Sequence, residues 1–288
     1  MEFINSYINQ LEKDSEKREE VYQSKYFKEY NYLYDCINGV VTNKQDTQNS
    51  IEKTIEEMHA KDVQKMLSCA NIIKQEIQEI MNRQCDFSIK GAILLLSDGS
   101  IDGHGILVDG EAYVFFDLNA ITRGIDKYNI KAFVFHEIIH AVHYGRNIEF
   151  YLKNHITTEE HYFKRMICEG IATYFTGKKT AEPAEDVYWL GYLNKSEVNI
   201  WTNKCEVMRK EIGGKLAESI EKNVLDMDLY SKLFSVINMN DMTSSRMAYY
   251  YGSKIIEELS TNHSFEEILQ KNYLEIRKIV WNYFCATV

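Results

Sequence analysis

Two histidines and a glutamate fall at the spacing of a metal-binding helix in the segment His136-Glu137-Ile138-Ile139-His140. On a helix, residues four apart lie one turn above each other, about 5–6 Å apart at Cβ. Two imidazoles in this arrangement can bind one Zn²⁺ at roughly 2.0–2.1 Å each. Glu137 is rotated by about 100° from His136, so it can lie beside the metal without binding it. There it could act as a general base toward a water molecule that the metal activates.

The residues around this motif are apolar, which favours a functional site over a chance match. Between Ala132 and Val142 the polar side chains are those of His136, Glu137 and His140. A helix that is otherwise apolar all round is buried, and buried polar groups need partners. The alternative is two surface histidines, or two core histidines with other partners, on a helix. The favoured interpretation is the HExxH arrangement that metalloproteases use for hydrolysis.

A catalytic zinc ion usually has three protein ligands and one open position, so the chain must supply a third ligand. Glu169 is the preferred candidate, because it interrupts an apolar helical pattern and precedes Gly170, where another helix could approach closely. A structural salt bridge is the alternative role for Glu169. His143 is expected beside the site, since one straight helix rarely supplies three ligands to a tetrahedral ion. The remaining candidates are Glu149, His155, Glu159, Glu160 and His161.

The motif and the later segment Glu169-Gly170-Ile171-Ala172-Thr173-Tyr174 together resemble the HExxH…EGxAxY signature of gluzincin metallopeptidases, in the peptidase MA-like superfamily. Within it, the chain looks most like the predicted bacterial zinc-dependent proteases. The resemblance implies His136, His140 and Glu169 as zinc ligands. It also implies Glu137 as general base, a sheet before the first ligand helix and a helical subdomain after the second.

Two further expectations follow from this resemblance. Tyr249 corresponds to a tyrosine that stabilises the oxyanion in related proteases, with core packing as its alternative role. The hairpin 104–119 could bind extended substrate along its edge, as an edge strand does in gluzincins, or it could be purely structural. Thr173 departs from the family pattern, since some gluzincins carry an acidic residue there. The segment 136–143 also resembles clostridial neurotoxin light chains, but the EGxAxY continuation argues against that kinship.

The elements that position these residues follow from local patterns. The apolar, glycine-bounded segment 91–99 predicts a strand, and 104–119 predicts a hairpin around Asp109-Gly110. Apolar residues in 47–81 recur at helical spacing, which predicts one long helix or two in series. Residues 1–40 predict one or two amphipathic helices. Further helices are expected at 127–145, 158–176, 186–194, 203–222, 226–237, 243–260 and 264–285, the last with a capping box of Ser264 and Glu267.

Strands followed by helices predict an α+β fold. We expect a small antiparallel sheet packed on the HExxH helix, followed by a helical subdomain. Three regions are expected: an N-terminal helical region at 1–85, a catalytic core at 86–180 and a C-terminal helical subdomain at 181–288.

Composition and charge restrict the class of protein. With 14 glycines and one proline in 288 residues, collagen-like and low-complexity classes are excluded and a turn-dense β-sandwich is disfavoured. The 33 basic and 43 acidic residues give a net charge of −10, without the basic footprint that nucleic-acid binding needs. No apolar run approaches the ~20 residues of a membrane span. Six dispersed cysteines without a CxxC pair, and no signal-peptide pattern, predict a cytoplasmic protein, with secretion by another route left open.

The function expected from these features is a zinc-dependent metallopeptidase, an endopeptidase acting on a peptide or protein substrate. One alternative is a non-catalytic zinc-binding regulatory protein with a gluzincin-like fold. Its site would be closed by a fourth ligand such as His143, His155 or His161. The same motif would also suit a secreted, toxin-like effector protease or a hydrolase of a different amide.

Overall fold

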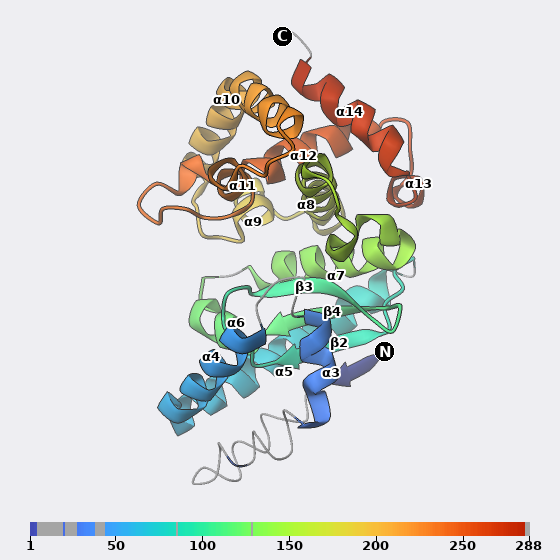
Figure 1. Ribbon diagram of the computed structural model, residues 1–288. Coiled ribbons are helices and arrows are strands. Elements are labelled where there is room, and N and C mark those ends of the chain that lie inside the picture. Colours follow the sequence, from blue (N-terminus) through green and yellow to red (C-terminus); the bar gives the residue numbers. More distant parts are fainter. Residues whose placement is uncertain (5–19, 21–27, 38–43, 85, 128, 286–288) are drawn as a thin grey trace. The chain divides into compact units, whose positions relative to one another are not determined.

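The protein is described by a computed structural model that covers residues 1–4, 20, 28–37, 44–84, 86–127 and 129–285 (Figure 1). The chain folds into two compact units, residues 1–145 and residues 146–288. The boundaries predicted at residues 85 and 180 therefore each lie inside one unit.

The first unit contains a four-stranded sheet with the strand order β1-β2-β4-β3. Its strands are β1 (Glu2–Ile4), β2 (Gly91–Leu95), β3 (Gly103–Val108) and β4 (Glu111–Asp117). Strands β1 and β2 pair in parallel, β2 and β4 pair in parallel, and β3 and β4 pair antiparallel. The α+β class is confirmed, but the prediction of an antiparallel sheet is wrong, because this sheet is mixed.

Burial explains why the pairing differs from the prediction. Every residue of β2 is buried, and so is every residue of β4 except Glu111. Strands buried on both faces are typical of parallel pairing, whereas a half-exposed antiparallel strand alternates apolar and polar residues. Since the hairpin places β3 on one side of β4, β2 pairs with the other side and runs in the same direction as β4. Figure 1 shows α7 on one side of this sheet and α5 on the other.

The predicted hairpin is confirmed. Strands β3 and β4 are joined by Asp109 and Gly110, whose φ angles are 51° and 82°. Positive φ at both central residues is the mark of a type I′ turn, whose twist matches that of paired strands. Asp109 accepts this conformation at small cost, and Gly110 at none.

The helices of the first unit are α3 (Lys28–Ile37), α4 (Lys44–Glu57), α5 (Ala60–Arg83), α6 (Leu118–Gly124) and α7 (Ile130–Arg146). The predicted helical segment 47–81 is two helices in series, because His59 interrupts it and caps α5 in a capping box with Asp62. Helix was also predicted for residues 1–40, but the first four contain β1, which is too short to show a period in the sequence. Residues 5–19, 21–27 and 38–40 of that prediction lie outside the described residues, as does Cys85.

The second unit is helical throughout its regular structure, as predicted. Its helices are α8 (Thr158–Thr180), α9 (Ala184–Trp189), α10 (Lys195–Glu221), α11 (Met227–Phe234), α12 (Met247–Leu259), α13 (Phe265–Leu269) and α14 (Tyr273–Cys285), with short 3-10 turns at Ile148–Phe150, Leu152–Asn154 and Met242–Ser244. The capping box of Ser264 and Glu267 is confirmed, but the predicted helix 264–285 is two helices. Helix α9 ends before the predicted 194, because Leu190 and Gly191 both have positive φ.

Helices α8 and α12 pack closely at a pair of glycines. A Cβ atom built on Gly170 would lie 2.3 Å from the backbone carbon of Gly252, and one on Gly252 would lie 2.1 Å from the Met166 oxygen. Neither position has room for a side chain. The close helix approach predicted at Gly170 is therefore confirmed, and α12 is the helix that makes it.

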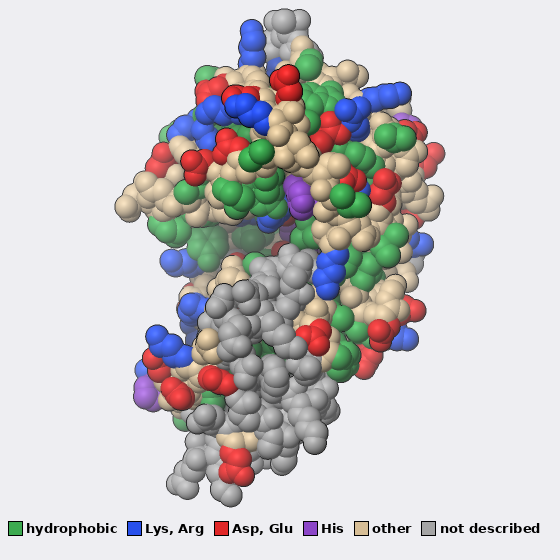
Figure 2. All heavy atoms as spheres, viewed as in Figure 1, with side chains coloured by type: hydrophobic (Ala, Val, Ile, Leu, Met, Phe, Trp, Pro, Cys, Tyr) green, Lys and Arg blue, Asp and Glu red, His purple; other side chains and the backbone are tan. Residues whose placement is uncertain are grey.

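Within the described ranges, none of the helices has the length and apolarity to cross a bilayer. On the face shown in Figure 2, lysines and arginines lie among acidic and neutral side chains. None of the five described cysteines forms a disulfide, and three of them (Cys69, Cys168 and Cys205) are buried.

Asp117 links the ends of the two central strands. Its buried carboxylate accepts hydrogen bonds from the backbone N–H groups of Ser97 (2.9 Å), Gly99 (2.7 Å) and Asn119 (2.9 Å), and it caps α6. Burial raises the pKa of this carboxyl to about 7, although the three N–H donors act in the opposite direction. One side chain thus fixes both the loop that leads into β3 and the start of α6.

Replacing Asp117 by alanine should destabilise the protein by about 3 kcal/mol, because three buried or half-buried N–H groups lose their acceptor. Chemical denaturation measures this change. Asp226→Ala is the matched control, since Asp226 caps α11 through the N–H groups of Asp228 and Leu229 at an exposed site. The control should cost only about 1 kcal/mol. Equal losses in the two variants would contradict the role given to Asp117.

Candidate metal centre

The two histidines of the motif lie on successive turns of α7. His136 and His140 are 5% and 2% exposed, and their Nε2 atoms are 3.1 Å apart, a hydrogen bond in which one ring donates and the other accepts. Two ligands at about 2.1 Å from a tetrahedral ion would be separated by about 3.4 Å, which is close to this distance. The helix is buried at every position from Ala132 to Tyr144, as its apolar sequence predicts.

The edge strand β3 runs in close contact with α7 at the motif. A Cβ atom on Gly105 would lie 2.4 Å from the Ala141 nitrogen and 2.6 Å from the His140 carbonyl carbon. A Cβ atom on Gly103 would lie 2.9 Å from Cγ of Glu137. Glycine at these two positions of β3 is therefore what allows the strand backbone to approach the helix so closely.

Two aromatic rings that the sequence analysis did not single out surround His140. The His104 ring on β3 lies 5.6 Å from the His140 ring, and the Tyr144 ring stacks on His140 at 5.9 Å with an interplanar angle of 19°. Tyr144 stands four residues after His140 on the same helix, which was a local signal for this contact. His104 belongs to another element, so no local pattern pointed to it.

Glu169 lies in the middle of α8 and is 5% exposed. The helix starts at a capping box in which the Thr157 hydroxyl accepts the Glu160 N–H and the Glu160 carboxylate accepts the Thr157 N–H. The neighbouring Gly170 makes the close contact with α12 described above. These features fix α8 on both sides of the carboxylate.

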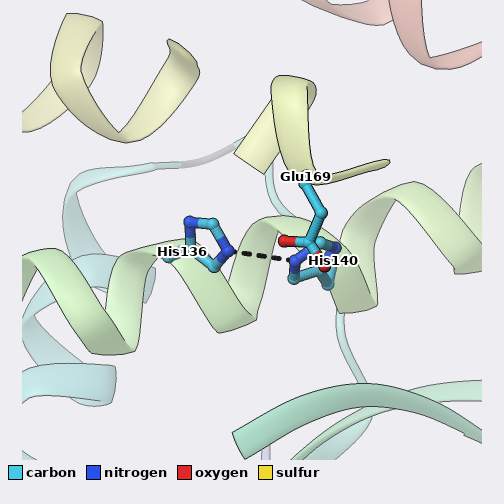
Figure 3. Close-up of side chains that lie close together, drawn as sticks. All are labelled: His136, His140 and Glu169. Atoms are coloured by element: carbon cyan, nitrogen blue, oxygen red, sulfur yellow. Dashed lines mark hydrogen bonds between the residues drawn. The ribbon is translucent and has the colours of Figure 1, made fainter. Parts of the chain in front are cut away.

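His136, His140 and Glu169 form a buried group that could hold a metal ion (Figure 3). The ligand atoms that they offer, one from each residue, lie within 4.8 Å of one another. Two imidazole nitrogens and one carboxylate oxygen are a donor set that suits Zn²⁺ with one position left open. The three residues that the sequence singled out as ligands are thus the three that the structure brings together.

The other candidate ligands have different surroundings. Over the described residues, the group consists of those three side chains and does not include His143, His155 or His161. Burial, with His140 nearby, lowers the pKa of His143 to about 3, so its ring is neutral at neutral pH. The Nε2 atom of His155 is 3.1 Å from the Phe150 carbonyl oxygen, and the His161 ring packs against His155.

The three acidic candidates contact neighbouring parts of the second unit. Glu149 accepts the backbone N–H of Tyr273, and Glu159 accepts hydrogen bonds from the Tyr273 hydroxyl and the Trp281 indole N–H. Glu160 belongs to the capping box of α8 and pairs with Lys164 at 2.6 Å. Their contacts account for these acids as structural groups, as their early position in α8 suggested for Glu159 and Glu160.

Tyr249 lies in the first turn of α12 and is half-buried. The Arg246 guanidinium carbon lies 3.9 Å from the centre of its ring. Arg246 itself has a φ of 54°, a strained conformation for a residue with a side chain. The role of Tyr249 in stabilising an oxyanion stays a prediction.

Arg165 is a residue near Glu169 that the sequence analysis missed. Its Nε atom lies 3.9 Å from Oε1 of Glu169, one helical turn away on α8. Burial alone would lower the pKa of Arg165, but Tyr230 and Glu169 raise it and the net shift is upward. The spacing of four residues between an arginine and a glutamate was the available signal.

Comparisons of the chain with protein-family models, with curated proteins and with solved structures found no match.

Replacing Gly105 by alanine should destabilise the protein by about 1–3 kcal/mol, because the new methyl group meets the α7 backbone at Ala141. Gly214→Ala is the control: Gly214 lies in α10 with no atom within 4 Å of an added Cβ, so alanine should stabilise by about 0.5–1 kcal/mol. Thermal unfolding of both variants measures the effect. A Gly105→Ala variant as stable as the unmodified chain would show that β3 does not pack on α7 in this way.

His155 should make stability depend on pH. Burial lowers its pKa from 6.5 to about 4 in the folded state, despite the opposing bond to Phe150. The folded state therefore binds fewer protons than the unfolded state between these values, and stability falls as the pH drops through this window. Between pH 7 and pH 5 the unmodified chain should lose about 2 kcal/mol more than His155→Gln, measured by urea unfolding. Identical losses would contradict this assignment.

Proposed function

We propose that this protein is a zinc-dependent metallopeptidase that hydrolyses internal peptide bonds of a peptide or protein substrate. The observation that carries the proposal is the buried group of His136, His140 and Glu169, with Glu137 next to the first ligand on the same buried helix. The α+β fold, with a sheet before α7 and helices after it, supports the resemblance to gluzincins.

His136, His140 and Glu169 would hold the zinc ion. When bound, zinc would polarise the carbonyl group of the scissile bond and lower the pKa of a water molecule. The chemistry of the donor set supports zinc, since imidazole and carboxylate are its common ligands in catalytic sites with three protein ligands. A group of four protein ligands would instead be typical of a structural site, and none of His143, His155 and His161 belongs to the group.

Glu137 would hold and move the proton. Its side chain is 8% exposed, and its Cγ atom lies against the backbone of β3 at Gly103, which restricts where the carboxylate can point. A carboxylate in that position accepts a proton from the attacking water and delivers it to the leaving amine. Tyr249 remains our candidate for stabilising the oxyanion.

We propose that extended substrate binds along β3, at the edge of the sheet. Among the described strands, β3 pairs with β4 on one side, and its other side is the edge of the sheet. An extended peptide can bind along an edge strand as a further strand. Because β3 also contacts α7 at Gly103 and Gly105, a peptide bound there would run past the motif.

The proposal is tested by replacing the general base without touching the ligands. Glu137→Gln should retain zinc but lose at least about 10²-fold in turnover, the scale expected for general acid–base catalysis. Elemental analysis gives the zinc content, and cleavage of a quenched fluorescent peptide library gives the activity.

His140→Ala is the control that removes a ligand, and it should lose both the zinc and the activity. Full activity of Glu137→Gln would refute the proposed mechanism. A full-length chain that takes up no zinc even when zinc is supplied would refute the metal site itself.

A further inference from the structure

The Arg165 side chain packs against two aromatic rings of α11. Its guanidinium carbon lies 5.2 Å from the centre of the Tyr230 ring and 4.7 Å from that of Phe234. Its Nη1 atom also donates a hydrogen bond of 2.5 Å to the Tyr230 hydroxyl. Tyr230 and Phe234 stand four residues apart on α11 with ring centres 4.9 Å from each other, so they present one continuous face. A guanidinium stacked in this way has little freedom to move.

The Arg165 side chain also pairs with a proposed metal ligand. Its Nε atom lies 3.9 Å from Oε1 of Glu169, and the two side chains are 27% and 7% exposed. Helix stability does not account for this pair, since an arginine that precedes a glutamate by four residues is the less favourable order on a helix.

We propose that Arg165 is a positioning residue that orients the Glu169 carboxylate for zinc, and that α11 controls the zinc affinity of the site although it supplies no ligand. This inference rests on the metal site proposed above. Partners that orient ligating carboxylates typically contribute 10–100-fold to metal affinity. Tyr230 and Phe234 act through Arg165, since they contact the guanidinium and Arg165 contacts the ligand.

The positive charge of Arg165 also has an opposing effect, because it repels a cation that binds at Glu169. Positioning outweighs this repulsion in our account, since an ion pair to a nearly buried carboxylate limits its orientation before the metal arrives. Removing the guanidinium would allow Glu169 to turn away from His136 and His140. Zinc binding would then have to restore the ligand geometry at a cost in affinity.

The test is zinc affinity, measured on the full chain by competition with a chromogenic chelator. Arg165→Met, which keeps the length of the side chain but removes its charge and planar group, should weaken zinc binding by 10–100-fold. Arg165→Lys keeps the charge, so it should lose less affinity than the methionine variant.

Arg209→Met is the matched control. Arg209 also stacks on an aromatic ring, that of Tyr283 at 5.1 Å, and pairs with a glutamate on its own helix, Glu206 at 4.0 Å. Neither Arg209 nor Glu206 belongs to the metal group. Arg209→Met should leave the zinc affinity within about twofold of that of the unmodified chain, because Arg209 contacts no proposed ligand. Thermal unfolding of the metal-free proteins compares the structural cost of the two substitutions.

The outcomes separate this inference from the proposed function. If the unmodified chain binds no zinc, the proposed function fails and the inference fails with it. If the unmodified chain binds zinc and Arg165→Met binds it equally well, Arg165 is only structural and the inference is overturned while the metal site stands. Tighter binding by Arg165→Met would also overturn it, because repulsion would then exceed positioning.

Discussion

Burial of three polar side chains on one apolar helix is the constraint on which the first unit depends. His136, Glu137 and His140 lie on α7, which is buried from Ala132 to Tyr144. A buried polar group that lacks a partner is costly, so the elements around α7 must supply suitable surroundings. Strand β3 covers the motif by approaching α7 at two glycines, and the His104 and Tyr144 rings lie against His140. The position of β3 in the sheet is thus linked to the polar residues of α7.

In the second unit, a single buried carboxylate likewise depends on the groups that pack around it. Helix α8 carries Glu169 at 5% exposure, with Gly170 in contact with α12 and Arg165 one turn earlier. The arginine is in turn fixed by the rings of α11. In the proposed metal site, a chain of packed groups would orient the Glu169 carboxylate, as the outer partners of a metal site usually do.

Much of this architecture could be predicted from local sequence, and the errors have physical causes. The hairpin around Asp109-Gly110 followed from turn residues, and the helical second unit followed from apolar periodicity. The sheet was predicted as antiparallel because the hairpin of β3 and β4 was the one strand pairing that local sequence indicated. Pairing of β2 with β4 joins segments separated by the whole of β3, and no local pattern records which edge of a strand is used.

The sequence by itself determined which residue types stand one helical turn apart, because the helix repeat fixes that relation without reference to any other element. From spacing it singled out His136 and His140 as candidate ligands, and it singled out Glu169 as an acid inside an apolar helical pattern. Only the tertiary structure decided which residues from distant parts of the chain pack around these side chains. Tyr230 stands 65 residues after Arg165, and their contact depends on how α8 and α11 pack. Packing of distant helix faces is cooperative, so no short segment encodes it.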